Sequence, residues 1–345
     1  MISLVSDTET RPTPAMREAI ASAEVGDEQR GEDPTVLLLQ DRVADLLGKE
    51  AGLWLPTGTM CNVVATKVHT APGDAIVADW MCHIVRAESG GVAFNAGVMV
   101  EAIRTERGIF GPSELDDALD RLTSVPPPYG QNARLVCVEQ THNFGGGAVW
   151  SLSALSAVCR VAHDRNIPVH MDGARLMNAC ISSGVPAAHF AAEVDSVWID
   201  FTKGLGAPIG AVLAGTESFI RRARRYKHLF GGAMRQAGVA AAGCLFALDH
   251  HVERLAIDHD HAKQLAVALA QIDGISVRAP TETNMVFFDV ARLGISNASF
   301  VERSAAAGVR MGLSGNFIRA VTHLDVSAEQ IRRTVEVVRS IANAA

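Results

Sequence analysis

Several patterns that mark common classes of protein are missing from this sequence of 345 residues. No GxxxxGKS/T motif occurs, and no GxGxxG motif follows the first expected strand, which argues against a nucleotide-binding protein. The longest stretch without a charged or strongly polar residue runs from Ala237 to Leu248 and is too short to cross a bilayer. The N-terminus reaches Asp7 and Glu9 too soon for a secretory leader.

Cysteine pairs and excess positive charge are also missing. The six cysteines include no CxxC pair and lie mostly in apolar stretches, as expected of buried thiols in a reducing compartment. A formal net charge of −7 argues against a nucleic-acid surface and an anionic-membrane surface. One basic cluster, residues 221–227, is interpreted as a solvated helix end. We therefore expect a cytoplasmic protein with neither nucleic-acid nor membrane partners.

Four histidines lie close together but do not form a recognisable metal-binding pattern. They are His250, His251, His259 and His261. HExxH does not occur, and His259 and His261 are two residues apart, so they do not share a helix face. We expect no metal site.

Runs typical of buried strands alternate with helical patterns along most of the chain. Strands are expected at 52–55, 75–78, 98–103, 135–139, 169–172, 196–199 and 211–214. Helices are expected from about Ala15 and at 36–47, 60–69, 113–122, 152–165 and 217–227. This alternation favours an α/β fold in which helices cover a mostly parallel sheet.

The pattern changes after about Leu248. A long polar helix is expected from there to Ala270, followed by strands at 275–278, 284–289 and 317–321. Helices are expected at 299–307 and from Ser327, where Ser327 and Gln330 fit a capping box. The sequence therefore predicts a large domain over residues 1–248 and a small C-terminal α+β domain over residues 249–345.

Two polar residues at the ends of expected strands carry the main chemical signal. Asp172 ends one strand, and Lys203 follows another in a turn that contains Gly204 and Gly206. A desolvated lysine is a usable amine nucleophile. A protein holds pyridoxal phosphate (PLP) with such a pair, because the lysine forms a Schiff base and the carboxylate keeps the pyridine nitrogen protonated. Taken singly, Lys203 could be a solvated lysine and Asp172 an ordinary helix cap.

Other candidate residues occur near further strand ends. Thr57-Gly58-Thr59 opens a helix and could hold one phosphate group, or it could be an ordinary turn. His83 could stack on a pyridine ring, accept a proton, or have a purely structural role. Arg175 and Arg319 could bind a carboxylate with their planar guanidinium groups, or form surface ion pairs.

With these residues the chain resembles the threonine aldolase family, PLP-dependent enzymes with the fold of aspartate aminotransferase. The resemblance covers nearly the whole length. Its segments include Ser6-Asp7-Thr8, Gly31 to Thr35, Pro56 to Met60, Thr141 to Asn143, Asp172 to Arg175, Lys203 to Pro208, Gly231 to Gln236, Thr283 to Phe287 and Arg319 to Asp325. It implies a PLP-dependent transferase-like fold (fold type I). It also implies a homodimer or homotetramer with active sites at the dimer interface.

The resemblance implies two groups of site residues. The group that would bind the cofactor is Lys203, Gly58, Thr59, His83, Asp172, Arg175 and Arg235, the last from a neighbouring subunit. The group that would bind the substrate is Ser6, Arg175, Arg319, Tyr129, His142 and Arg30. Lys203, His83 and Asp172 would be catalytic, with His83 stacked on the ring. The base could be His83, another histidine such as His142, or a bound water.

The implied reaction is cleavage of the Cα–Cβ bond of an L-β-hydroxy-α-amino acid, which yields glycine and an aldehyde. Threonine, allo-threonine and phenylserine are the expected substrate types. Arg30 stands where many family members have tyrosine. Tyr129 stands where many have a histidine near the substrate β-hydroxyl, so the threo or erythro preference stays open. The alternatives are a β-eliminating lyase or transaminase on the same scaffold and a non-catalytic PLP-binding protein.

Overall fold

The computed structural model describes residues 1–126, 128–278 and 280–344, and it contains two sheets. The larger sheet has the strand order β2-β8-β7-β6-β5-β3-β4. Its strands are β2 (Ala51–Leu55), β3 (Ala75–Asp79), β4 (Met99–Ile103), β5 (Ala133–Glu139), β6 (Val169–Asp172), β7 (Ser196–Asp200) and β8 (Ala211–Gly215). Strands β4, β3, β5, β6 and β7 are parallel, and β8 is antiparallel to both neighbours. The predicted α/β fold with a mostly parallel sheet is confirmed.

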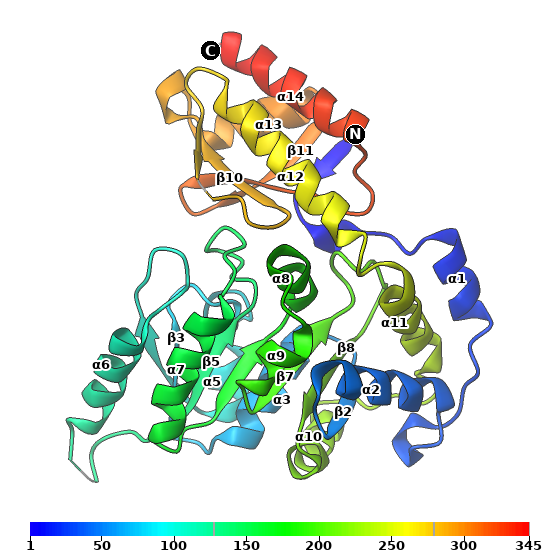
Figure 1. The fold of residues 1–345 in the computed structure, drawn as a ribbon, viewed down its shortest axis with the longest axis vertical. Coiled ribbons are helices and arrows are strands. Elements are labelled where there is room, and N and C mark those ends of the chain that lie inside the picture. The colour runs from blue at the N-terminus through cyan, green and yellow to red at the C-terminus, as the bar shows by residue number, and fades with distance from the viewer. Residues whose placement is uncertain (127, 279, 345) are drawn as a thin grey trace.

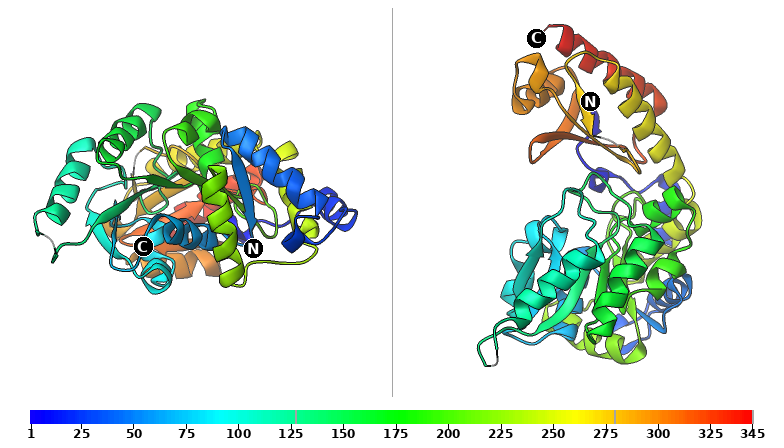
Figure 2. Two further views of the ribbon diagram at one scale, coloured as in Figure 1. Left: turned by 90° about the horizontal axis from the view of Figure 1, so that it is seen from below. Right: turned by 60° about the vertical axis from the view of Figure 1, so that its left-hand side comes forward.

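Helices cover both faces of this sheet (Figure 2). They are α1 (Pro14–Ala21), α2 (Pro34–Leu47), α3 (Gly58–His69), α4 (His83–Arg86), α5 (Gly91–Ala96), α6 (Pro112–Thr123), α7 (Leu152–Asp164), α8 (Leu176–Ser183), α9 (Ala187–Ala192), α10 (Glu217–Leu229) and α11 (Gly238–His250). Asp33 caps α2 and Thr57 caps α3 through their side chains. Because successive residues of a strand point to opposite faces, Trp54 joins one apolar cluster while Leu53 and Leu55 join another.

The smaller sheet lies at the top of Figure 1 and has the order β1-β11-β12-β10-β9. Its strands are β1 (Ile2–Leu4), β9 (Ser276–Arg278), β10 (Met285–Asp289), β11 (Val309–Ser314) and β12 (Phe317–Val321). The helices of this part are α12 (Leu255–Ala270), α13 (Asn297–Ala306) and α14 (Ala328–Asn343). Strand β1 pairs in parallel with β11, and Leu4 belongs to the same apolar cluster as Phe288 and Phe300. The first strand therefore packs with the C-terminal elements, while the division at 248/249 stays a prediction.

The C-terminal half differs from expectation in two details. The prediction of one helix from about Leu248 to Ala270 is wrong, because α11 ends at His250 and α12 begins at Leu255 after a turn. Helix α12 is also less polar than expected, since it buries Leu255, Leu265 and Leu269. The capping box of Ser327 and Gln330 at the start of α14 is confirmed.

The cysteines agree with the expectation of buried thiols. The six cysteines are unpaired, and all but the half-buried Cys180 are buried. Among the helices in the described part of the chain, none combines the length and the apolar character needed to span a bilayer.

The basic cluster at residues 221–227 is not simply a solvated helix end. Lys227 of α10 is fully buried, and its Nζ donates to Oε1 of Glu28 at 2.6 Å. Glu28, in the short helix η2 (Glu28–Arg30), also accepts the backbone N–H of Met234. Burial lowers the pKa of Lys227, while the bond to Glu28 opposes that shift. The pair therefore holds η2 against α10 and against the loop that follows α10.

We expect Lys227→Met to destabilise the fold by about 3–5 kcal/mol, because it leaves the Glu28 carboxylate buried and unpaired. Urea unfolding would show this as a lower midpoint. The double variant with Glu28→Gln should recover much of the loss, since no buried charge then remains. A Lys227→Met protein as stable as the wild type would contradict the importance of the pair.

Candidate active site

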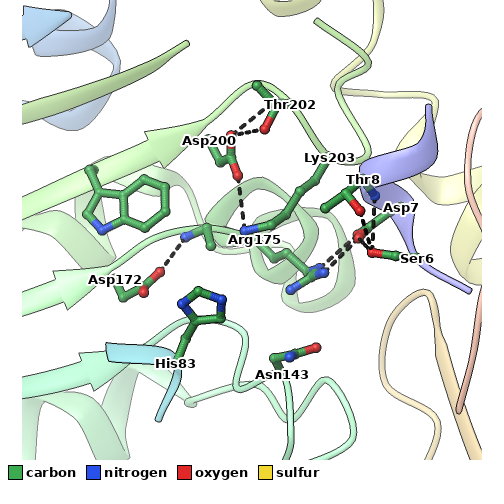
Figure 3. A network of polar contacts seen from close by, with 12 residues as sticks. Ser6, Asp7, Thr8, His83, Asn143, Asp172, Arg175, Asp200, Thr202 and Lys203 are labelled. Carbon is green, nitrogen blue, oxygen red and sulfur yellow. Dashed lines mark hydrogen bonds and ion pairs between the residues drawn. The ribbon is translucent and has the colours of Figure 1, made fainter. Parts of the chain in front are cut away.

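A cavity of about 550 Å³ opens near the C-terminal ends of the parallel strands. Strands β6 and β7 end at Asp172 and Asp200, and the chain turns from Asp200 to Lys203. The residues lining the cavity include Thr57, Gly58, Thr59, His83, Glu88, Trp198, Asp200, Thr202 and Lys203. Figure 3 shows Asp172, His83 and Lys203 facing a common space. Side chains from distant parts of the sequence are thus brought together.

Lys203 is largely buried and is held by an ion pair. Its Nζ lies 3.0 Å from Oδ2 of Asp200 and 5.7 Å from the centre of the Trp198 ring. Gly204, the next residue, packs closely in this turn, since a Cβ there would lie 2.7 Å from Cδ2 of Leu255. The backbone carbonyl of Lys203 accepts the Thr10 hydroxyl at 2.8 Å. The position of the amine in the cavity is therefore fixed by Asp200 at the side chain and by Thr10 at the backbone.

Asp172 is a buried carboxylate with two hydrogen-bond donors. Its oxygens accept Nδ2 of Asn62 at 2.8 Å and the backbone N–H of Ala174 at 3.0 Å. Burial, and after it the negative charge of Glu139, raises the pKa of Asp172 to about 6. A carboxylate in this setting is stabilised by a cationic partner.

Asn62, on α3, connects several groups beneath the cavity. Its Oδ1 accepts the indole N–H of Trp198 at 2.8 Å, and its Nδ2 donates to Glu88 as well as to Asp172. An indole nitrogen can only donate, so this network fixes which end of the amide faces the two carboxylates.

His83 begins α4 beside the cavity. Its Nδ1 lies 2.8 Å from Oε1 of Glu88, and its backbone N–H donates to Glu139 at 2.7 Å. Burial disfavours the charged imidazole, but the bond to Glu88 and the charges of Asp172 and Glu139 outweigh it and raise the pKa of His83.

His142 is placed differently from His83. It is fully buried, its Nδ1 accepts the Gly145 N–H at 3.0 Å, and its Nε2 lies 3.2 Å from Oδ1 of Asp79. Among the described residues Nε2 makes no hydrogen bond, and the buried ring does not line the cavity. His83 and a bound water therefore remain as candidates for the base.

The two candidate carboxylate-binding arginines also differ. Arg175 is buried and already forms a two-pronged pair with Asp7, through Nε at 2.8 Å and Nη2 at 2.6 Å. Burial acts against ionisation of Asp7, but Arg175 outweighs it and lowers the pKa of Asp7. Asp7 takes two of the five guanidinium donors, so the binding of a carboxylate or of the cofactor by Arg175 stays a prediction. Ser6 lies next to this pair, and its hydroxyl accepts the backbone N–H of Thr8.

Arg319, on β12, reaches the site from the smaller sheet. Its Nη1 donates to Oδ1 of Asn143 at 2.9 Å, and its Nη2 donates to the carbonyl of Val5 at 3.0 Å. Within the described part of the chain, its buried Nε has no hydrogen-bond partner. Burial, together with the charge of Arg175, lowers the pKa of Arg319. A guanidinium with an unused buried donor suits an anionic ligand.

The turn before α3 presents backbone N–H groups to the cavity. The Thr57 hydroxyl accepts the N–H of Met60 at 3.2 Å, and Gly58 and Thr59 form the first turn. Gly58 is required by packing, since a Cβ there would lie 2.3 Å from Cη2 of the buried Trp198 ring. The helix start can therefore hold an anion close to Lys203.

Three expected site residues lie outside this group. Arg30 and Arg235 are exposed, and both lie near the carboxylate of Asp27. Tyr129 is 80% exposed and precedes β5. Because the cavity lies at the far end of this seven-residue strand, the chain places Tyr129 about 20 Å or more from its own site. A role of Tyr129 near a substrate, from another subunit, therefore stays a prediction.

Several site residues were missed by sequence reasoning. Asp200 lies three residues before Lys203 and, like Asp172, ends a strand, so its position was a usable signal. Asp7 stands in the Ser6-Asp7-Thr8 segment but had no assigned role. Asn62 and Glu88 carry no local signal, since the first lies within a helix and the second in a loop.

These residues fit PLP. Lys203 offers an amine, Asp172 offers a buried carboxylate in need of a cation, and the turn at Gly58 and Thr59 offers donors for a phosphate. His83 lines the space between them.

Comparison with known proteins agrees with this chemistry. A model of the β-eliminating lyase family matches residues 3–292. The low-specificity L-threonine aldolase 1 of Arabidopsis thaliana is 37% identical over 342 residues, covering 97% of this chain and 94% of the relative. The low specificity L-threonine aldolase of Escherichia coli strain K12 is 38% identical over 332 residues, covering 96% of each.

The chain belongs to the β-eliminating lyase family. Its fold matches a solved Leishmania major threonine aldolase with a TM-score of 0.85 at 20% identity, covering 99% of this chain and 100% of the other. A Sphingomonas wittichii serine palmitoyltransferase matches with a TM-score of 0.75 at 17% identity, covering 99% and 87%. The expected fold type and family are confirmed, and the protein is a PLP-dependent lyase.

We expect Gly58→Ala to weaken PLP binding and to destabilise the protein by about 1–3 kcal/mol, because the new methyl group overlaps the Trp198 ring. Thermal unfolding and PLP titration would measure both effects. Gly91→Ala is a matched control, since its Cβ would meet Val63 at an ordinary 3.4 Å. Equal behaviour of the two variants would show that the helix start tolerates the methyl group.

Proposed function

We propose that this protein cleaves L-threonine and related L-β-hydroxy-α-amino acids between Cα and Cβ, giving glycine and an aldehyde. The observation that carries the proposal is that Lys203, after β7, lines the cavity, while Asp172, at the end of the adjacent strand β6, faces the same space (Figure 3). The relatives named as L-threonine aldolases support the same reaction. Allo-threonine and phenylserine are further candidate substrates.

Lys203 and Asp172 have different roles toward the cofactor. When bound, PLP supplies an electron sink for the pair released as the Cα–Cβ bond breaks. Lys203 would hold the cofactor through its amine, the nucleophile that the cavity offers to an aldehyde. Asp172 would hold the protonated ring nitrogen, whose positive charge would stabilise the buried carboxylate. Gly58 and Thr59 would hold the phosphate.

Arg319 orients the substrate. Its unused Nε donor, with the neighbouring Ser6, binds the substrate carboxylate. Holding the carboxylate would fix the rotation about the Cα–N bond of the substrate and so orient the Cα–Cβ bond for cleavage. Arg175 acts indirectly by fixing Asp7 beneath this position. His83, which lines the cavity, would exchange a proton at Nε2, either with the β-hydroxyl or with a bound water.

The assembly is proposed to be a homodimer or homotetramer of the cytoplasm. The exposed Arg235 supports this, since a side chain outside its own cavity is free to reach the phosphate site of a neighbouring subunit. In the same way, Arg30 or Tyr129 can approach a site only from another subunit.

A second candidate activity is β-elimination. The description of the matched family favours it, and PLP enzymes on one scaffold share the same electron sink. The two reactions differ in the bond that breaks and therefore in their products.

With L-threonine we expect glycine and acetaldehyde, and with L-serine little pyruvate or ammonia. Product analysis by chromatography separates the two activities, and pyruvate and ammonia as main products would favour β-elimination. Lys203→Ala should abolish cleavage and the visible absorbance of the lysine-bound cofactor. Lys263→Ala, at an exposed position on α12, is the control. Full activity of Lys203→Ala would remove the basis of the proposal.

Asp172→Asn should still bind PLP but turn over about a hundredfold more slowly, because a neutral amide does not keep the ring nitrogen protonated. Steady-state kinetics after confirmed cofactor loading would measure this. The exposed Asp260→Asn variant serves as control. Unchanged turnover in Asp172→Asn would refute the proposed pairing.

A further inference from the structure

Glu88 is a buried carboxylate that has no role in the reaction described above. It lies in the loop after α4 and lines the cavity. Its Oε1 accepts Nδ2 of Asn62 at 2.7 Å and lies 2.8 Å from Nδ1 of His83. Its Oε2 is buried without a hydrogen-bond partner among the described residues. A half-satisfied buried carboxylate is unfavourable for folding, so its position calls for a functional explanation.

The contact with His83 determines where the imidazole carries its proton. A carboxylate oxygen can only accept, so Nδ1 must be the protonated nitrogen of the neutral ring. The other nitrogen, Nε2, is then unprotonated. Since His83 itself lines the cavity, Nε2 is left as the atom that can accept a proton there.

Asn62 links this contact to Asp172. One amide group donates to both carboxylates, at 2.7 Å to Glu88 and 2.8 Å to Asp172. A ring nitrogen of His83 and carboxylate oxygens of Glu88 and Asp172 all lie within 4.8 Å of one another. Asp172 and the Glu88–His83 pair therefore share one support, the Asn62 amide.

We propose that Glu88 is a positioning residue that fixes the Nδ1–H form of His83 and favours its protonated state, leaving Nε2 to exchange the proton of the reaction. This inference rests on the proposed function for its catalytic consequence. The state of the imidazole itself does not depend on that function.

The charges around His83 support the direction of the effect. Three carboxylates face it: Glu88 from its own loop, Glu139 from β5 and Asp172 from β6. Burial lowers the pKa of His83, and among the opposing causes the hydrogen bond to Glu88 is the largest. Removing that charge should therefore favour the neutral ring, while the amide of a glutamine can still accept from Nδ1.

The test is NMR of the cofactor-free protein labelled with ¹⁵N-histidine, in the wild type and in Glu88→Gln. We expect the neutral wild-type ring to carry its proton on Nδ1. In Glu88→Gln the protonation midpoint of His83 should fall by about one pH unit, a tenfold change at a given pH. The limb of the kcat/KM profile that reports His83 should shift to lower pH in parallel.

Glu329→Gln, which removes an exposed carboxylate on α14, should leave the midpoint unchanged. An unchanged midpoint in Glu88→Gln would overturn the proposal. So would an Nε2–H ring in the wild type, a result that needs no variant and decides the matter even if Glu88→Gln does not fold. Failure to cleave threonine would refute the proposed function alone, because the NMR measurement uses neither substrate nor cofactor.

Discussion

Four acidic residues buried along one edge of a parallel sheet impose the main physical constraint on this protein. They end strands β3, β5, β6 and β7 and are Asp79, Glu139, Asp172 and Asp200. Like charges gathered in a poorly solvated place destabilise one another unless donors or cations surround them. The loops after these strands supply such groups, including backbone N–H groups, Lys203 and the histidines. Much of the site can therefore be understood as compensation for this row of carboxylates.

The four carboxylates are not stabilised equally, and the difference indicates which of them needs a cationic partner. Asp200 has a lysine, and Glu139 accepts two backbone N–H groups, from His83 and Asn143. Asp172 is buried with neutral hydrogen-bond donors, so burial first and the charge of Glu139 second raise its pKa to about 6. A pyridinium nitrogen beside Asp172 would supply the positive charge that these neutral donors lack.

The strands and the polar residues at their ends were predictable from sequence, because both are marked by neighbouring residues in the chain. Val169 to Asp172 reads as a buried strand with a carboxylate at its end, and the glycines after Lys203 mark the turn. The pairing of Arg175 with Asp7 was not predictable, because the two residues lie 168 residues apart in the sequence. The pairing of β1 with β11 and the burial of Lys227 against Glu28 likewise depend on distant partners. Tyr129 could have been excluded from the site of its own chain, since it precedes a parallel strand whose other end forms that site.

The first ten residues connect the smaller sheet to the reactive lysine. Strand β1 covers an edge of β11, Asp7 occupies the Arg175 guanidinium, and Thr10 bonds to the carbonyl of Lys203. Proteolytic trimming before Asp7 would expose a strand edge that can pair with other molecules and cause aggregation. It would also loosen the turn that carries the amine. An affinity tag is therefore better carried after α14, whose end lies at the top of the view, on the far side of the smaller sheet from the large one (Figure 1).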